Sequence, residues 1–241
     1  EEAREKMLAP SAYDIYQEIL DEINEAIKGT DLSFRLSETN NYWYSGLREV
    51  SNSFASALWA LDYLYWWVSH GAAGLSFHTG DITGGVRQQP TFYAAFASSD
   101  EGYAAMPLAY GMKLFSLGSN GRIIPVEIST PDSQNVVAYA TQNTDESTFL
   151  TIINKEINSD EDQEISVFFD RKIKDTGLKA ISLQAKSNNI AEISSVTLGG
   201  ASIYENGTWE GEWSDLNYKV VNDSVFSVKM SGASALLIQI K

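Results

Sequence analysis

One carboxylate is distinguished by its neighbours. In the stretch FRLSETNNYWY, residues 34–44, a strand-like run ends at Glu38 and is followed by two asparagines and three aromatic residues. Aromatic rings stack on the apolar faces of sugars, and amides such as those of Asn40 and Asn41 bind hydroxyl groups. Glycoside hydrolysis uses two carboxylates beside an oxocarbenium-like transition state. The stretch therefore indicates a carbohydrate site, and an ordinary loop carrying a surface glutamate is the alternative.

Other chemistries lack the residues that they need. The chain has no cysteine and only two histidines, His70 and His78, so thiolate and histidine-rich metal sites are excluded. The glycines of TGDITGG, residues 79–85, have neither the spacing nor the lysine of a phosphate-binding loop. No serine has the context of a nucleophile elbow. We expect no cofactor, and we expect His70 to cap the end of an apolar helix.

Composition and charge limit the partners. The 241 residues are 44% hydrophobic and 20% charged, which is typical of globular proteins. A net charge of −15 repels nucleic acids and sulfated polymers, although one anionic sugar can still bind in a local pocket. The most apolar stretch, residues 54–68, carries Asp62 and is short for a membrane span, so it predicts a buried helix. Localisation is not determined; secretion or a periplasmic location fits the intact protein.

Helical and strand patterns alternate before residue 120. We expect helices over residues 15–27, from Ser51 or Ser53 to Gly71, and over residues 107–118, with strands over residues 32–38 and 72–78. Such alternation predicts parallel βα units, whose functional residues lie at the C-terminal ends of the strands. Glu38 and His78 both fall at such ends.

Short strand patterns follow from Arg122 onward. Their alternation predicts an antiparallel sandwich, and Asn206-Gly207 predicts a tight turn. The patterns therefore predict a fold class of α/β plus all-β, with βα units in residues 1–121 and a β-sandwich domain of structural role in residues 122–241.

Several segments of the chain resemble a known family. The segment from Glu38 to Gly80 carries Glu-Thr-Asn, FASALWALDYL and AGLSFHTG, and it resembles the nucleophile region of glycoside hydrolase family 79, the β-glucuronidase and heparanase-like family. AMPLAYGMKLF, residues 105–115, and VTLGGASIYENGTW, residues 196–209, resemble the last barrel helix and the C-terminal β-domain of that family. The resemblance thus spans nearly the whole chain, and it implies that residues 1–121 are the last two βα units of a (β/α)8 barrel.

The resemblance implies roles for individual residues. Glu38 would be the nucleophile of a retaining β-glucuronidase, at the end of the seventh barrel strand. The substrate, a glucuronide or an oligosaccharide derived from a polysaccharide, would contact residues after that strand and after the next: Asn40, Tyr42, Trp43, Tyr44, His78 and Tyr93.

The resemblance also implies that part of the barrel lies outside this chain. A complete barrel takes about 250 residues, so strands one to six and the acid/base glutamate would lie outside this chain. We therefore expect the isolated chain to be inactive and its open strand edges to be covered by the β-domain or by self-association. Two alternatives remain: a retaining glycosidase of a neighbouring barrel family with another sugar specificity, and a carbohydrate-binding or structural module without turnover.

Overall fold

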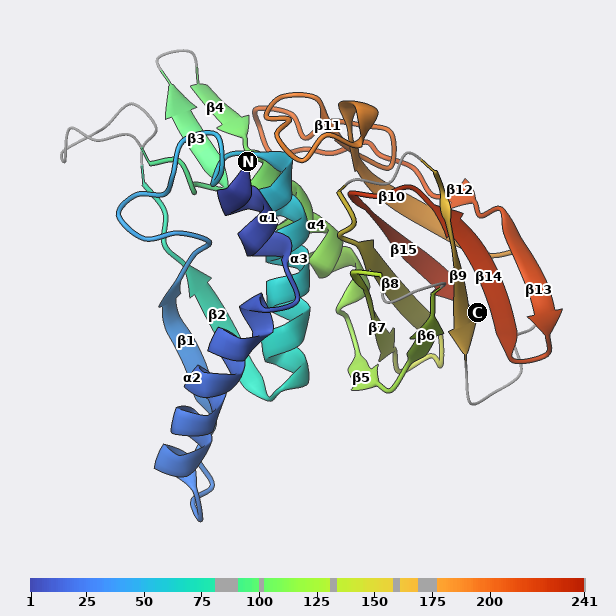
Figure 1. Ribbon diagram of the computed structural model, residues 1–241, viewed down its shortest axis with the longest axis horizontal. Coiled ribbons are helices and arrows are strands. Elements are labelled where there is room, and N and C mark those ends of the chain that lie inside the picture. Colours follow the sequence, from blue (N-terminus) through green and yellow to red (C-terminus); the bar gives the residue numbers. More distant parts are fainter. Residues whose placement is uncertain (81–90, 100–101, 131–133, 158–160, 169–176, 241) are drawn as a thin grey trace.

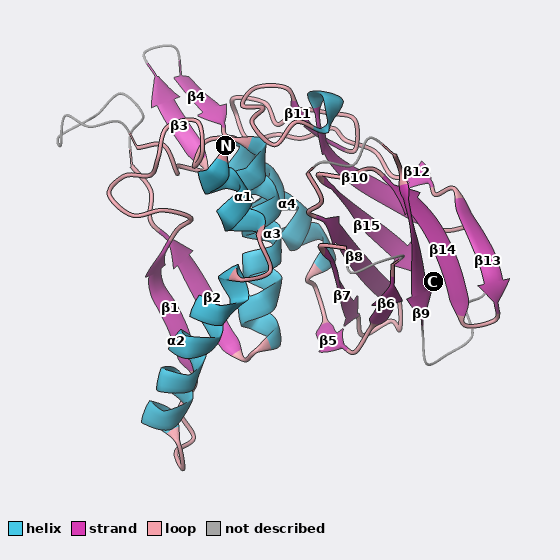
Figure 2. Cartoon of the chain, in the orientation of Figure 1, coloured by secondary structure: helices cyan, strands magenta, loops and turns pink. Residues whose placement is uncertain are grey.

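The protein combines helices and strands in its first half with sheets in its second (Figures 1 and 2). The computed structural model describes residues 1–80, 91–99, 102–130, 134–157, 161–168 and 177–240. Within these residues the strands do not close into a barrel. No helix in the same ranges is long and apolar enough to cross a membrane.

The N-terminal half contains the predicted alternation of helices and strands. Its elements are α1 (Glu2–Leu8), α2 (Ala12–Ile27), β1 (Phe34–Thr39), α3 (Phe54–Ser69), β2 (Ala72–Phe77), β3 (Phe96–Ser99), β4 (Gly102–Ala105) and α4 (Pro107–Gly118). Strands β1 and β2 pair in parallel, as predicted. Helix α1 and the β3–β4 hairpin were not predicted, because seven-residue and four-residue elements are too short to show a clear periodicity.

An irregularity in β1 determines where Glu38 points. Phe34 and Leu36 face α3, and simple alternation would place residue 38 on that same face. The register shifts between Leu36 and Thr39, and the Thr39 hydroxyl lies 2.7 Å from the Tyr63 hydroxyl of α3. Thr39 thus faces the helix, and the Glu38 side chain is left 73% exposed. Bulges commonly re-aim a side chain in this way.

The C-terminal half consists of antiparallel strands, as predicted. They are β5 (Arg122–Ile124), β6 (Glu127–Ser129), β7 (Val136–Gln142), β8 (Thr148–Asn154), β9 (Gln163–Phe168), β10 (Lys179–Ala185), β11 (Val196–Leu198), β12 (Ser214–Asp215), β13 (Tyr218–Asn222), β14 (Val225–Met230) and β15 (Ser234–Ile240), with a short 3-10 turn, η1 (Lys186–Asn188). One sheet has the order β11-β10-β15-β8-β7-β5, with β12 beside β10, and the other has the order β13-β14-β9-β6. A buried apolar cluster joins both sheets. The predicted turn at Asn206-Gly207 is present, with Gly207 at φ +78°.

Helices α3 and α4 form the centre of the molecule. Figure 1 shows them between the β1–β2 sheet on one side and the larger antiparallel sheet on the other. Helix α3 is apolar on all faces, and its residues 54–67 are buried in a core that also includes residues of β8, β10 and β15. One core therefore crosses the proposed boundary at residue 121, and that boundary remains a prediction.

A buried ionic network joins the two halves. The Asp62 carboxylate of α3 accepts hydrogen bonds from the Tyr13 hydroxyl at 2.6 Å, the Tyr139 hydroxyl at 2.7 Å and the Lys155 ammonium at 2.7 Å. Lys155 also donates to the Tyr13 hydroxyl at 2.8 Å. Asp62 and Lys155 are only 6% and 3% exposed. The network connects α2, α3, β7 and the residue after β8.

The network predicts a large effect of removing Lys155. Lys155→Met leaves the Asp62 carboxylate buried without its counter-ion, so we expect the free energy of unfolding to fall by about 3 kcal/mol. Lys179→Met is the matched control, because the Lys179–Asp215 pair is exposed; we expect a loss of less than about 1 kcal/mol. Urea denaturation of both variants measures the difference, and equal losses would contradict the role of the network.

The same network predicts instability in alkali. Burial, and next the Asp62 charge, raises the pKa of Tyr13 and of Tyr139. Unfolded tyrosine ionises near pH 10, so the stability from these protonated residues is complete below about pH 10 and is lost as the pH rises further. We expect the urea midpoint to be steady from about pH 7 to 9 and to fall above about pH 10, and to fall less steeply in Tyr139→Phe. An equally steep fall in that variant would contradict the assignment.

Candidate active site

Glu38 and His78 meet at the C-terminal ends of the two parallel strands. The His78 backbone N–H donates to the Thr39 carbonyl at 2.9 Å, which extends the pairing past β2. The His78 Nδ1 lies 2.6 Å from the Glu38 Oε1. His78 thus holds one carboxylate oxygen and leaves the other available. The structure places these two predicted site residues at the strand ends, as expected, and brings them into contact.

Asn40 connects the strand ends through the backbone. Its Nδ2 donates to the His78 carbonyl at 2.7 Å and to the Tyr93 carbonyl at 3.2 Å. Its Oδ1 accepts from the Asn41 N–H at 2.8 Å. Both amide hydrogens are therefore directed to main-chain carbonyls, and this side chain fixes the positions of His78 and Tyr93.

Asn41 connects the loop to α3. Its Nδ2 donates to the Ser56 hydroxyl at 2.5 Å and to the Ser51 carbonyl at 3.3 Å. Ser51 and Ser56 are both buried, so this loop is attached to the buried start of α3. The loop after Glu38 consequently has a defined path.

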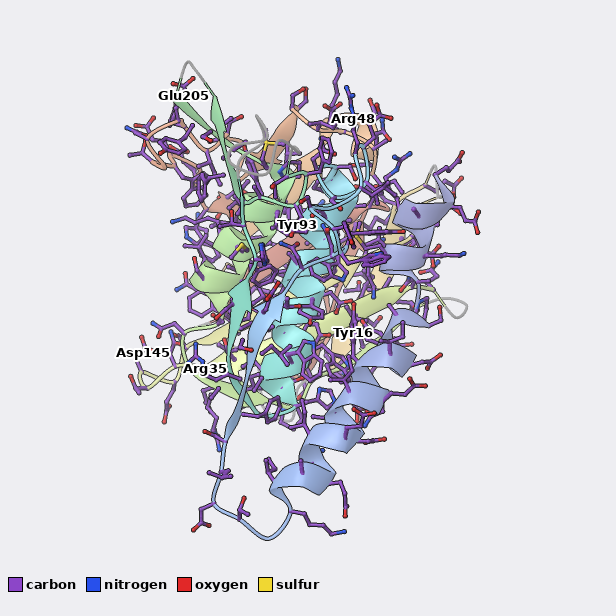
Figure 3. All side chains as sticks on the ribbon, turned by 90° about the vertical axis from the view of Figure 1, so that its left-hand side faces the viewer. Tyr16, Arg35, Arg48, Tyr93, Asp145 and Glu205 are labelled. Atoms are coloured by element: carbon purple, nitrogen blue, oxygen red, sulfur yellow. The ribbon has the colours of Figure 1, made fainter. Side chains whose placement is uncertain are left out.

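Tyr93 lies beside His78. The two rings are 5.7 Å apart with an interplanar angle of 66°, and Tyr93 is 7% exposed. Figure 3 views the molecule from this side and shows Tyr93 near the upper ends of β1 and β2, with α3 behind them and Tyr16 to one side. The predicted residues Glu38, His78 and Tyr93 thus form one cluster.

A hollow of about 950 Å³ adjoins this cluster. We call it the Glu38 hollow. Its walls come from α1, α2, α3, the strand ends and the loop that follows β1. All of the predicted site residues line it, namely Glu38, Asn40, Tyr42, Trp43, Tyr44, His78 and Tyr93, together with Tyr16, Trp59 and Tyr63 among others. Glu38 is the one carboxylate among the described residues of its wall.

Some residues of the site were not predicted. Tyr16, Trp59 and Tyr63 lie on helices, where apolar periodicity indicates only burial. The contacts of the two tyrosine hydroxyls cannot be predicted from the sequence. The Tyr16 hydroxyl accepts from the Trp59 Nε1 at 2.9 Å, and the Tyr63 hydroxyl contacts the Thr39 hydroxyl. Within the described residues, no group of three or more His, Cys, Asp or Glu side chains could hold a metal ion.

His70 lies apart from this site. It follows α3, its Nδ1 is 2.7 Å from the Trp66 carbonyl, and its ring stacks on Trp66 at 3.9 Å. This confirms the predicted capping position.

Comparison with solved structures identifies the kind of fold. The chain matches no protein-family profile and no curated protein. It is similar to a 4-O-α-L-rhamnosyl-β-D-glucuronidase from Fusarium oxysporum 12S, with 18% identity and a TM-score of 0.62 over 83% of this chain and 42% of that one. It is also similar to the GH51 arabinofuranosidase from Xanthomonas axonopodis pv. citri, with 14% identity and a TM-score of 0.63 over 93% of this chain and 44% of that one.

A family 51 α-L-arabinofuranosidase from Bifidobacterium longum gives the same result, with 14% identity and a TM-score of 0.62 over 99% of this chain and 49% of that one. The fold is therefore of the kind found in glycoside hydrolases. At these identities the likeness shows the fold alone. The chain spans less than half the length of each of these three structures.

Gly46 provides a test of how tightly this site is built. It has φ +84°, and a Cβ atom there would lie 2.9 Å from the Tyr93 backbone nitrogen and 3.0 Å from the Ser51 hydroxyl. We expect Gly46→Ala to displace the Tyr93 segment and to lower the free energy of unfolding by more than about 2 kcal/mol.

Gly200→Ala is the control, because Gly200 has φ +77° but open space around it. It should lose only about 1 kcal/mol, from backbone strain. Urea denaturation and the NMR signals of the His78 and Tyr93 rings report both effects. Equal losses, with unmoved ring signals, would contradict close packing at Gly46.

Proposed function

We propose that this chain is the C-terminal portion of a retaining β-glycosidase, with Glu38 as the nucleophile. The observation that carries the proposal is the paired carboxylate and imidazole at the ends of two parallel strands, beside a large hollow walled by aromatic rings. Carboxylates at strand ends are where barrel enzymes carry their chemistry. The glycosidase-like fold is consistent with this role.

The geometry suggests how Glu38 would act. His78 holds Oε1, so Oε2 would attack the anomeric carbon while the glycosidic oxygen leaves. This forms an ester between Glu38 and the sugar, and a water molecule then displaces Glu38 with a second inversion. The anomeric configuration is therefore retained. Asn40 would fix the carbonyls that carry His78 and Tyr93, rather than bind a hydroxyl as its residue type alone suggests.

A second carboxylate is needed to protonate the leaving group. Glu38 is the one carboxylate among the described residues that line the hollow, so we propose that the acid/base residue belongs to a further part of the protein. The isolated chain would then be inactive. The length of the similar structures, each more than twice the part that this chain matches, supports the proposal.

The open sheet is consistent with a further part of the barrel. Within the described residues, β1 and β2 pair only with each other, whereas parallel sheets are normally buried and extended. Ile15 and Ile19 of α2 are 60% and 42% exposed and line the Glu38 hollow. A second hollow of about 430 Å³ lies beside β2 and α4, lined by apolar residues that include Leu75, Phe77, Met112 and Trp209. We propose that neighbouring strands cover the exposed Ile15 and Ile19 side chains and fill the second hollow, while the Glu38 hollow stays open for the sugar. Self-association would cover these apolar surfaces where such strands are absent.

The sugar is proposed to be β-linked glucuronate. This choice depends on the family 79 resemblance of residues 38–80 and is consistent with the likeness to a rhamnosyl-glucuronidase. The arabinofuranosidases have similar TM-scores, so the alternative is a retaining glycosidase that acts on another sugar. Activity on a panel of sugars therefore has to accompany the test of the nucleophile.

The test uses the longer protein that contains this chain. We expect it to cleave 4-nitrophenyl β-glucuronide and Glu38→Gln to lower kcat by about 10⁴-fold or more, because the amide cannot form the glycosyl ester. Glu127→Gln, at an exposed position in β6, is the control and should retain activity. Release of nitrophenolate measures both.

Each outcome has a distinct meaning. Cleavage of the xyloside, glucoside or arabinofuranoside but not of the glucuronide would contradict the sugar assignment alone. Full activity in Glu38→Gln would contradict the nucleophile. Saccharide binding without any turnover would favour the non-catalytic module.

A further inference from the structure

Trp43 and Tyr44 form an exposed aromatic pair in the loop after β1. The two residues are 76% and 80% exposed, and the centres of their rings are 4.9 Å apart at an interplanar angle of 85°. Large aromatic side chains normally bury most of their surface in the core of a protein. Two neighbouring rings left in solvent therefore call for an explanation by function.

The backbone beneath the pair is held in an unusual conformation. Tyr44, Ser45 and Gly46 have φ angles of +55°, +70° and +84°, so three consecutive residues are left-handed. This conformation is unfavourable for the two residues that carry a Cβ atom. Strain of this kind persists only where the surroundings enforce it, and it concentrates at functional sites.

The surroundings do enforce it. The Gly46 N–H donates to the Trp43 carbonyl at 3.1 Å, and the Phe92 N–H donates to the Ser45 carbonyl at 2.7 Å. The Leu47 N–H donates to the buried Ser51 hydroxyl at 2.9 Å. The loop is thus attached to the Tyr93 segment and to the residues before α3, and the exposed rings have a fixed backbone to hold them.

The pair is continuous with the candidate active site. Both rings line the Glu38 hollow. Residues near them in the chain include Leu47, which is 41% exposed, and the exposed charged residues Arg48 and Glu49. Charged side chains thus interrupt the apolar surface around the pair, unlike the apolar surfaces that protein partners cover. An aromatic ring that is open to solvent and lines the same hollow as a carboxylate suits the apolar face of a sugar ring.

We propose that Trp43 and Tyr44 form a second sugar subsite, which stacks on the ring adjacent to the one at Glu38. The preferred substrate is then an oligosaccharide rather than a glycoside of a single sugar. The proposal deepens the proposed function and rests on it only for the position of the first ring. Stacking depends on ring faces rather than on a hydrogen-bond pattern, so this subsite tolerates different neutral sugars.

The experiment measures binding, because binding does not require the acid/base residue. The 241-residue chain is titrated with methyl β-D-glucuronide and with a β-linked trisaccharide that contains glucuronate, and the indole N–H signals of the tryptophans are followed by NMR. We expect the trisaccharide to bind about three- to tenfold more tightly than the monosaccharide, the range expected of one aromatic stacking contact. The Trp43 indole signal should shift with the trisaccharide only.

The variants isolate the pair. Trp43→Ala and Tyr44→Ala should each weaken binding of the trisaccharide more than binding of methyl β-D-glucuronide, and so reduce the affinity gain of the longer ligand. Tyr103→Ala is the matched control, because Tyr103 is 61% exposed in β4 and lies outside the Glu38 hollow; it should retain the full gain. Glu38→Gln should also retain the gain, which separates this proposal from that of the nucleophile.

Several results would overturn the subsite. They are the absence of saccharide binding, equal affinity for the two ligands, a gain that survives Trp43→Ala, and equal weakening of both ligands in that variant. Sedimentation velocity tests the alternative that the pair is an interface between copies of the chain. If Trp43→Ala abolishes self-association and leaves the higher affinity for the trisaccharide intact, the pair is a protein interface and not a sugar subsite.

Discussion

The buried Asp62 carboxylate is the interaction on which the rest of the structure depends. Three donors from Tyr13, Tyr139 and Lys155 surround it, and they come from parts of the chain that precede and follow α3. A buried ion pair is stable only when such hydrogen bonds satisfy both partners. The network therefore orients α3 between the β1–β2 sheet and the larger sheet, where an all-apolar helix alone could rotate without losing burial.

A few polar contacts connect α3 to the candidate site, so the orientation of the helix determines the position of the loop after β1. The Thr39 hydroxyl hydrogen-bonds to the Tyr63 hydroxyl, and the Asn41 amide donates to the Ser56 hydroxyl. The residues on either side of Asn40 are therefore both attached to α3. The irregular register of β1 then turns Glu38 to the opposite face, where His78 meets it. The site is in this sense attached to the core, and Trp43 and Tyr44 project from it into solvent.

Periodicity and chemistry predicted much of this from the sequence. The patterns of α2, α3 and α4 were sufficient to predict parallel βα units and to place Glu38 and His78 at the ends of the two strands. The bulge was not predictable, because alternation is broken by a contact between Thr39 and Tyr63 that is distant in sequence. Asp62 stood out as a charge in an apolar helix, but its partner Lys155 is 93 residues away. Asn40 was expected to bind sugar because residue type does not reveal which carbonyls lie within reach.

The central claim is that Glu38 forms a covalent bond to the sugar. A 2-deoxy-2-fluoro β-glucuronide with a good leaving group slows the second step of a retaining enzyme, so a glycosyl ester accumulates. Peptide mass spectrometry of the longer protein after such treatment measures the site of attachment. We expect one added sugar on the peptide that contains Glu38 and none in Glu38→Gln. Attachment to another carboxylate, or turnover of the glucuronide with inversion and no adduct, would contradict it.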